Sequence, residues 1–269
     1  MDLSTRRSEI GWQRRQVAAD HPIFRIATYN MLKGGTKRVH WQRMLLEHNV
    51  DLLLAQESFT QNQHLPRSEF PQLAGRSIWS AAGNNKWGSA VCSKTGQMER
   101  VALRGFKGWA TGVRITGADW QPAGTSTLVV SVHAPNGPGS YRGQVNKILD
   151  RISRVAKGDD VIVGGDFNIS ISTSAASDRP VHEGNLAMQL RLQEEFGLIN
   201  CWQAANTDQP IPQTLRWTGD RTIPYHCDGI FVPASWQERL CSCEVLNGPD
   251  WDALSDHNPV VAEFESANS

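Results

Sequence analysis

The chain has 269 residues, 39% of them hydrophobic, so it can bury a sizeable core in one large domain or two small ones. Its 27 Lys and Arg residues balance 27 Asp and Glu residues, so the net charge does not indicate a nucleic-acid partner. A local basic rim could still bind one without changing that total. No run of about 18 apolar residues occurs, and no membrane span is expected.

The cysteines and the N-terminus add further limits. The cysteines are odd in number and match neither a zinc spacing nor a disulfide framework: they are Cys92, Cys201, Cys227, Cys241 and Cys243. Residues 1–22 are polar and Arg-rich without an apolar signal region, so we expect an N-terminal polar extension followed by one domain over residues 23–266. A cytoplasmic location is the expectation.

The first elements predict a β–α–β unit. Ile23–Met31 alternates apolar and polar residues, which predicts a strand. Val39–His48 carries apolar residues at helical spacing and predicts an amphipathic helix. Val50–Glu57 is a short apolar run whose length fits a buried strand. This order indicates a right-handed crossover between two parallel strands.

The rest of the chain alternates further strands with helices, separated by loops rich in Gly, Pro, Ser and Asn, without a domain linker or an internal repeat. Helices are expected at Tyr141–Val155 and Gly184–Phe196. The loops are expected at Asn136–Ser140, Ser170–Pro180, Asn206–Gln213 and Asn247–Asp250. The expected strands are Trp87–Ser93, Trp109–Ile115, Thr127–His133, Asp160–Gly164, Cys227–Val232, Cys241–Leu246 and Pro259–Phe264. The pattern predicts a single layered α/β sandwich, an α/β (α+β) fold.

Polar residues of the kinds that bind metals or phosphates stand at the ends of the predicted strands. In an open α/β sheet the strand ends lie along one edge, where ligands bind. Six separate segments would therefore deliver their side chains to one rim. These residues are Asn30, Glu57, His133, Asp166 with Asn168, Asp228, and Asp256 with His257.

Such a set suits a hard divalent cation. Carboxylate and amide oxygens favour Mg²⁺ or Mn²⁺, whereas Zn²⁺ prefers His and Cys. Glu57 and Asp256, with Asn30, are the expected metal ligands. Each residue alone also has an ordinary explanation: Asn30 could be a strand-end turn residue, and Asp166 with Asn168 could form an Asx turn. Their number and order favour the metal site.

Six motifs in this order resemble the endonuclease/exonuclease/phosphatase superfamily, which includes DNase I-like nucleases. The resemblance runs from about residue 23 to 265. GGDFN followed by SDHNPV is highly specific, whereas TYN and QE alone are weak signals. The motifs are TYN at 28–30, QE at 56–57, SVHAPN at 131–136, GGDFN at 164–168, CDGIF at 227–231 and SDHNPV at 255–260.

The resemblance implies a four-layer sandwich of two mixed β-sheets packed face to face, with helices outside. It implies a metal-dependent phosphodiesterase with Glu57 as the principal metal ligand. Asp166 and Asn168 would position the attacking water and the phosphate. His257, oriented by Asp228, would contact the scissile phosphate.

The resemblance also implies roles on the substrate side of the site. His133 would be a second phosphate contact or a general acid. The expected substrate-binding residues are Asn136, Arg142 and Lys33, although Arg142 could serve packing instead. The implied cofactor is Mg²⁺ or Mn²⁺, and the implied partner is nucleic acid as substrate.

Departures from subfamily patterns bear on the substrate. Abasic endonucleases carry Tyr where this chain has His133. DNase I-like nucleases carry His there, backed by a carboxylate, yet residues 84–86 are Asn, Asn and Lys. Inositol phosphatases show a Pro-x-x-Cys-Asp pattern, which residues 224–228 match, but they carry Arg where Gly229 follows. Phosphoinositide hydrolysis therefore ranks below nuclease activity.

Aromatic and basic residues near the motifs bear on the substrate as well. Tryptophan can stack on bases, although filling a sandwich core is its commoner use. The tryptophans near predicted loops or strand ends are Trp79, Trp87, Trp109, Trp217 and Trp251. The cations that flank the motif loops are Lys33, Lys86, Arg142, Arg179 and Arg221.

These observations lead to three hypotheses. The first is a Mg²⁺- or Mn²⁺-dependent hydrolase of DNA or RNA phosphodiesters. The second is a phosphatase or phosphodiesterase that acts on a small or lipid phosphoester: an inositol phosphate, sphingomyelin or a nucleotide. The third is a catalytically inactive binding module, which would require a broken motif, and the six motifs are intact.

Overall fold

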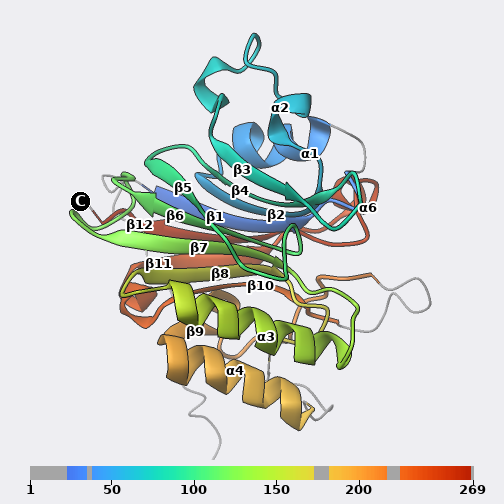
Figure 1. Cartoon of the computed structure of the whole chain (residues 1–269), viewed down its shortest axis with the longest axis vertical. Helices are drawn as coiled ribbons and strands as arrows, with labels where there is room; N and C mark the ends of the chain where they lie inside the picture. The colour runs from blue at the N-terminus through green and yellow to red at the C-terminus, as the bar shows by residue number, and fades with distance from the viewer. Residues whose placement is uncertain (1–22, 35–37, 173–181, 217–224, 268–269) are drawn as a thin grey trace, which may run out of the picture.

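The computed structural model describes residues 23–34, 38–172, 182–216 and 225–267. Two six-stranded mixed sheets form the centre (Figure 1). The first has the order β11-β12-β1-β2-β4-β3, and the second has the order β5-β6-β7-β8-β10-β9. Nothing in the described part of the chain forms a helix with the length and apolar character that crossing a bilayer requires.

The strands of the first sheet are β1 (Ile23–Asn30), β2 (Leu52–Ser58), β3 (Ser77–Ala81), β4 (Gly88–Ser93), β11 (Leu240–Val245) and β12 (Val260–Glu265). Those of the second are β5 (Gln97–Val101), β6 (Ala110–Thr116), β7 (Ser126–His133), β8 (Asp160–Asp166), β9 (Leu198–Asn200) and β10 (Asp228–Pro233). The central strands are apolar because both of their faces are covered: β4 and β10 are buried along their whole length.

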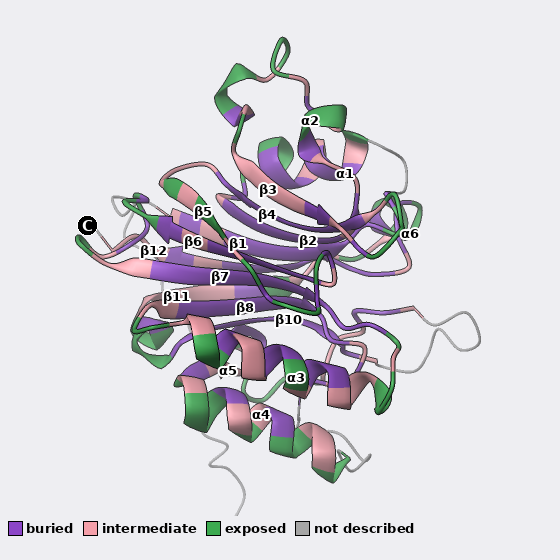
Figure 2. Cartoon of the chain, viewed as in Figure 1, coloured by how far each residue is buried: buried purple, intermediate pink, exposed green. Residues whose placement is uncertain are grey.

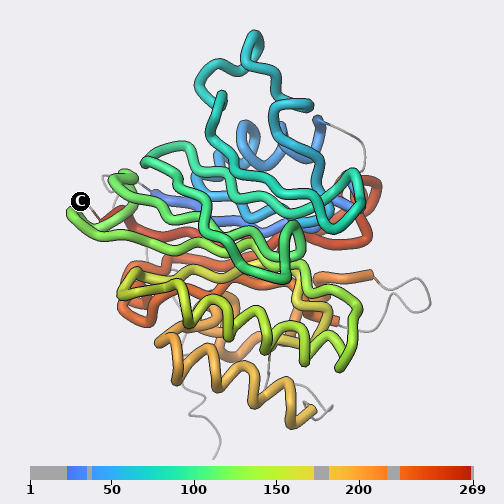
Figure 3. Tube along the Cα trace, in the orientation of Figure 1, coloured from blue at the N-terminus to red at the C-terminus, as the bar shows by residue number. Residues whose placement is uncertain are grey.

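Helices cover the outer face of each sheet, and the tube view follows the same order of layers (Figures 1 and 3). The second sheet is covered by α3 (Ser140–Val155) and α4 (Glu183–Phe196). On the first sheet lie α1 (Arg38–Gln42), a π-helical turn (Arg43–Glu47) and α2 (Gln61–His64). The shorter elements are α5 (Cys201–Ala205), α6 (Pro249–Asp252) and 3₁₀ turns at Pro71–Leu73 and Ala234–Arg239.

Three apolar clusters separate these layers, and burial is densest along the central strands (Figure 2). One lies between the sheets and includes Leu54, Ile162 and Ile230. The second packs α3 and α4 on their sheet, and the third packs the first helical turns on the other. The four-layer sandwich expected from the sequence is thus confirmed.

Polar contacts also join the two sheets beneath the edge that carries the motif residues. Gln56 donates from Nε2 to Ser131 Oγ at 3.0 Å, and Ser131 Oγ donates to the Ala55 carbonyl at 3.0 Å. The Ser89 and Thr111 hydroxyls lie 2.8 Å apart. Because these groups are buried and mutually satisfied, they fix how one sheet sits on the other.

The expected strands are all present, with boundaries that differ by one or two residues. The predicted parallel pairing of the first two strands is confirmed by the register Asn30↔Gln56. The predicted helix at Val39–His48 is α1 followed by a π-helical turn. The prediction of a loop at Asn247–Asp250 is wrong in part, because α6 starts at Pro249. The fixed φ of proline suits the first turn of a helix.

The sequence patterns do not reveal the edge strands. β5 is largely exposed and polar, and β9 has three residues, so neither shows a buried-strand pattern. β3 is short and half-buried. Residues 1–22 and most of the loop expected at 170–180 lie outside the described residues.

Candidate active site

The predicted site residues come together where β1, β2, β7 and β8 end. β7 and β8 are parallel, and their last pair is His133↔Asp166. β10 runs antiparallel to β8 and starts with the pair Asp228↔Asp166. Parallel strands thus deliver a histidine and an aspartate side by side, and the antiparallel neighbour adds a second aspartate.

Glu57 reaches this edge through a bulge in β2. The β2–β4 register shifts between Ala55 and Ser58, and Glu57 has a left-handed φ of 47°. A bulge re-aims a side chain, and a non-glycine residue at such φ is strained. Glu57 Oε1 lies 3.5 Å from His133 Nε2. Its other oxygen, Oε2, is buried without a hydrogen-bond partner among the described residues.

Asp166 is the centre of the cluster and is 1% exposed. Its Oδ2 accepts from Asn30 Nδ2 at 3.1 Å and from Asn168 Nδ2 at 3.3 Å, and its Oδ1 accepts from the Asn168 backbone N–H at 2.8 Å. The last bond closes an Asx turn. The Asx turn that the sequence offered as an ordinary explanation of Asp166 and Asn168 is therefore present within the cluster. Oδ2 also lies 3.8 Å from the Nε2 atoms of both His133 and His257.

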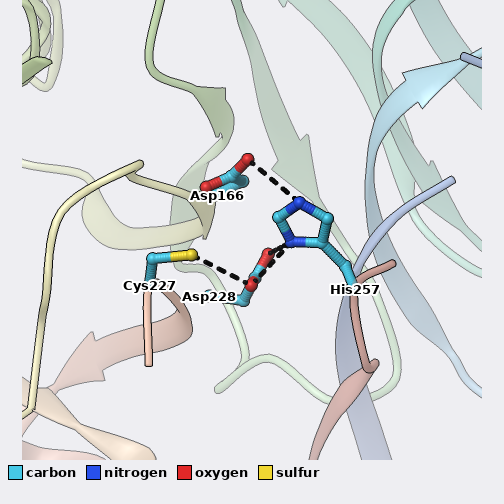
Figure 4. Close-up of side chains that lie close together, drawn as sticks. All are labelled: Asp166, Cys227, Asp228 and His257. Carbon is cyan, nitrogen blue, oxygen red and sulfur yellow. Dashed lines mark hydrogen bonds and ion pairs between the residues drawn. The ribbon is translucent and has the colours of Figure 1, made fainter. Parts of the chain in front are cut away.

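Asp228 and His257 form a buried pair. His257 Nδ1 lies 2.9 and 3.1 Å from the two Asp228 oxygens (Figure 4). Burial alone would lower the pKa of His257, but the negative charges of Asp228 and Asp166 outweigh it and raise the pKa to about 10. His257 is therefore an imidazolium at neutral pH, with Nδ1–H donating to Asp228 and Nε2–H facing Asp166.

His133 has different surroundings. Its ring lies 5.3 Å from Trp109 and 5.7 Å from Trp87, centroid to centroid. Its Nδ1 is buried without a hydrogen-bond partner among the described residues. Burial lowers the pKa of His133, and the attraction of Asp166 offsets this in part. His133 is therefore neutral at pH 7.

Burial also raises the pKa of both Glu57 and Asp166, against the lowering effect of His257. Both carboxylates are thus poised for a positive partner or a proton. Asp256, next to His257, likewise has a buried Oδ1 with no partner in the described part of the chain. Glu57 and Asp256 each have an oxygen with spare capacity, and Asn30 Oδ1, which accepts from the Leu32 backbone N–H at 3.1 Å, is a third hard oxygen; these donor types fit Mg²⁺ or Mn²⁺.

A second group of potential ligands lies beside this one. Single ligand atoms of Asp166, Cys227, Asp228 and His257 all lie within 4.8 Å of one another (Figure 4). The Cys227 thiol donates to Asp228 at 3.4 Å, and burial raises its pKa well above the ordinary value, so it is no thiolate. His257 Nδ1 is taken by Asp228. These bonds make the group a hydrogen-bonded network, and the spare oxygens of Glu57 and Asp256 fit a cation better.

The three predicted substrate-binding residues are placed differently. Lys33 is exposed, and its charge acts on both Glu57 and His133, so it borders the cluster. Asn136 is exposed in the loop after β7. Arg142 contacts His182 Nδ1 at 2.7 Å, at the start of α4, which accords with a packing role. Trp217, Arg179 and Arg221 lie outside the described residues.

Sequence reasoning missed the segment 213–216, which connects Asp228 to His257. Thr214 Oγ1 accepts from the backbone N–H groups of Cys227 and Asp228 at 3.0 and 3.1 Å. Leu215 makes an isolated bridge with His257. The Arg216 guanidinium donates to Asn258 Oδ1 and to the Ser255 carbonyl, and it lies 3.0 Å from Asp252. No sequence signal marked these residues, because their roles depend on contacts with distant segments.

The two face-to-face sheets, with a carboxylate–imidazole cluster where their strands end, define a DNase I-like α/β sandwich. A family model confirms the assignment from sequence: residues 27–257 match the Endonuclease/Exonuclease/phosphatase family, and the chain belongs to that family. Among curated proteins, no sequence matches the chain significantly.

Solved structures share the fold. An AP endonuclease from Archaeoglobus fulgidus is similar with a TM-score of 0.65 at 20% identity, covering 90% of this chain and 99% of that one. A 3′ phosphatase, NExo, from Neisseria, bound to product DNA hairpin, gives 0.65 at 17% identity, with 90% and 99% covered. The endonuclease domain of TRAS1, a telomere-specific non-LTR retrotransposon, gives 0.61 at 17%, with 90% and 98% covered.

Proposed function

We propose that the chain is a Mg²⁺- or Mn²⁺-dependent phosphodiesterase that hydrolyses DNA or RNA. One observation carries the proposal: the carboxylates of Glu57 and Asp166 and the imidazoles of His133 and His257 are linked by pairwise distances under 4 Å at one strand edge. The family contains endonucleases, exonucleases and phosphatases, which supports phosphoester hydrolysis. The similar structures include two endonucleases and a 3′ phosphatase bound to DNA, which favours nucleic acid.

Glu57 and Asp256, with Asn30, would hold the metal. When bound there, the ion would stabilise negative charge on a phosphoryl or leaving oxygen. Asn30 would also fix Asp166, since its Nδ2 donates to Asp166 Oδ2. The Asn30 side chain would therefore connect the metal ligands to Asp166, the residue that would orient the water.

Asp166 would orient the attacking water and accept its proton. Three hydrogen bonds hold the carboxylate in place, and burial raises its pKa towards the range that suits a general base. Its Oδ2 faces both histidines, so the proton it takes could pass to Nε2 of the neutral His133, whereas Nε2 of His257 already carries a proton and would donate.

The two histidines would bind the phosphate from two sides. His257 carries a positive charge held by Asp228, and that charge would stabilise the oxygens of the pentavalent transition state. His133 is neutral, and its Nε2 would donate or accept one hydrogen bond at a phosphate oxygen or the leaving group. Lys33 at the border would add a phosphate contact.

The test is a cleavage assay on single- and double-stranded DNA and RNA beside a phosphoinositide and sphingomyelin, with Mg²⁺ or Mn²⁺ and with EDTA. We expect nucleic acid to be cut in the presence of metal, and the cutting to disappear in EDTA and in His257→Ala. Cleavage that persists in EDTA, or turnover confined to a lipid or inositol phosphate, would contradict the proposal.

A further inference from the structure

Two loops beside His133 concentrate cations and aromatic rings. The β3–β4 loop at residues 82–87 ends in Lys86 and Trp87, and the loop at 102–109 between β5 and β6 carries Arg104, Lys107 and Trp109. The three cations are exposed and the two indoles are half-buried. We call these five residues the Lys–Trp rim.

The rim is assembled from both sheets and is held rigidly. The Trp87 and Trp109 rings meet edge-on at 5.4 Å and 85°. Ser89 Oγ donates to the Gly108 carbonyl at 2.8 Å, and a Cβ added to Gly108 would lie 2.1 Å from the Ala81 backbone. Such close approach requires glycine, so the two loops are locked against each other and the rings are pre-organised.

Charge is distributed unevenly around the active edge, although the chain is neutral overall. The loops on the His133 side, residues 31–34, 82–87, 102–109 and 134–139, together contain Lys and Arg and no Asp or Glu. In the described part of the chain, no carboxylate forms an ion pair with Lys86, Arg104 or Lys107. The stretch 247–256 on the His257 side contains three Asp and no Lys or Arg, although Arg43 and Arg216 pair with Asp250 and Asp252 from other segments.

We propose that the Lys–Trp rim is the binding site for an unpaired, single-stranded stretch of polynucleotide that leads into the active site. This rests on the proposed function and specifies its substrate. The negative charge on every phosphate of a polynucleotide matches the exposed cations. The exposed parts of the two half-buried indoles would stack on bases. Duplex interiors keep their base faces stacked on one another, so the aromatic part of the rim selects unpaired nucleotides.

The test is equilibrium binding of the full chain to a fluorescent oligothymidylate, followed by anisotropy in EDTA so that nothing is cleaved. Trp87→Ala and Trp109→Ala should each weaken binding about tenfold, since each removes a ring on which a base stacks. Trp87→Phe and Trp109→Phe keep a stacking face and should bind within about threefold of the wild type. These variants keep the test informative if an alanine variant fails to fold.

The cations are tested by salt dependence. Lys86→Glu and Lys107→Glu should each lower the slope of log Kd against log salt by about 0.7 for every phosphate that the lysine neutralises in the wild type. Lys147→Glu, at an exposed position of α3 on the outer layer, is the matched control and should keep the wild-type slope.

Three results would overturn the inference: rim variants that bind the oligonucleotide like the wild type, a duplex of equal length that binds more tightly than the single strand, or binding to phosphatidylserine vesicles in place of the oligonucleotide. Because the assay involves no turnover, it is separate from the proposed function. A chain that binds single strands through the rim and cleaves nothing would contradict only the hydrolase proposal.

Discussion

The two histidines of the active edge stand in contrasting environments. His257 is backed by Asp228, lies beside an acidic stretch and is charged. His133 is backed by Trp87 and Trp109, lies beside a basic rim and is neutral. Both present Nε2 to Asp166 at 3.8 Å. One residue type thus takes two charge states, because the charges of Asp228 and Asp166 raise the pKa of His257 whereas burial lowers the pKa of His133.

The largest expected effect on kcat comes from substituting His257. His257→Ala should lower kcat by about 10³-fold, because it removes the positive charge that would stabilise the phosphate in the proposed mechanism. The measurement is steady-state cleavage of a labelled oligonucleotide with Mn²⁺. His133→Ala is the counterpart and should cost about 10²-fold or less, since it removes a neutral group. Equal losses of kcat in the two variants would contradict the claim that His257 acts as a charged group and His133 as a neutral one.

Asp228→Asn should have the next effect, a loss of about 10²-fold in kcat. The amide keeps the shape but loses the negative charge that holds His257 protonated, so the pKa of His257 falls. Activity of the variant should become more sensitive to rising pH, since the imidazolium is lost at a lower pH than in the wild type. A pH–rate profile checks this; a profile with wild-type shape argues against the Asp228–His257 pair.

Thr214→Val should cost about tenfold in kcat. It removes the hydroxyl that accepts from the Cys227 and Asp228 backbone N–H groups, and an unsatisfied buried N–H costs about 1–3 kcal/mol. Thr214→Ser keeps the hydroxyl and is the matched control. Combined with His257→Ala, the valine variant should cause little further loss, because both act through one pair. Fully additive losses would show that Thr214 does not act through the Asp228–His257 pair.

The last prediction concerns stability in acid, which is separate from activity. Burial lowers the pKa of His40 and His226 to about 4, so both are neutral when folded, whereas in the unfolded chain they take up protons below about pH 6.5. The unfolded state then binds more protons, so the free energy of unfolding falls between about pH 6.5 and 4, by about 1.4 kcal/mol per pH unit for each histidine. Urea unfolding of His226→Gln should show a shallower fall; an unchanged slope would contradict this.

The fold and the central cluster could be predicted from the sequence because both follow from local patterns. Apolar runs that end in Asn30, His133 or Asp166 are visible in one strand at a time, and the parallel pairing of their strands brings the ends together. The order of the six motifs along the chain then indicated the superfamily. Glu57 was predicted as a ligand, but the bulge that turns it toward the edge depends on pairing with β4.

What the sequence did not predict depends on contacts between distant segments. Trp87 and Trp109 come from different sheets, and nothing in either loop indicates that both pack on His133. The same holds for Thr214, whose role is defined by the backbone of Cys227 and Asp228. The charge states of the two histidines also follow from tertiary burial and could not be assigned from residue type.

The central claim is that Glu57 holds a divalent cation while Asp228 and His257 serve the phosphate. Titration of Mn²⁺ into the metal-free chain, followed by electron paramagnetic resonance, tests this directly. We predict that the wild type and Asp228→Asn bind Mn²⁺ with similar affinity, and that Glu57→Gln binds it at least about tenfold more weakly. A Glu57→Gln variant with wild-type Mn²⁺ affinity would contradict the claim.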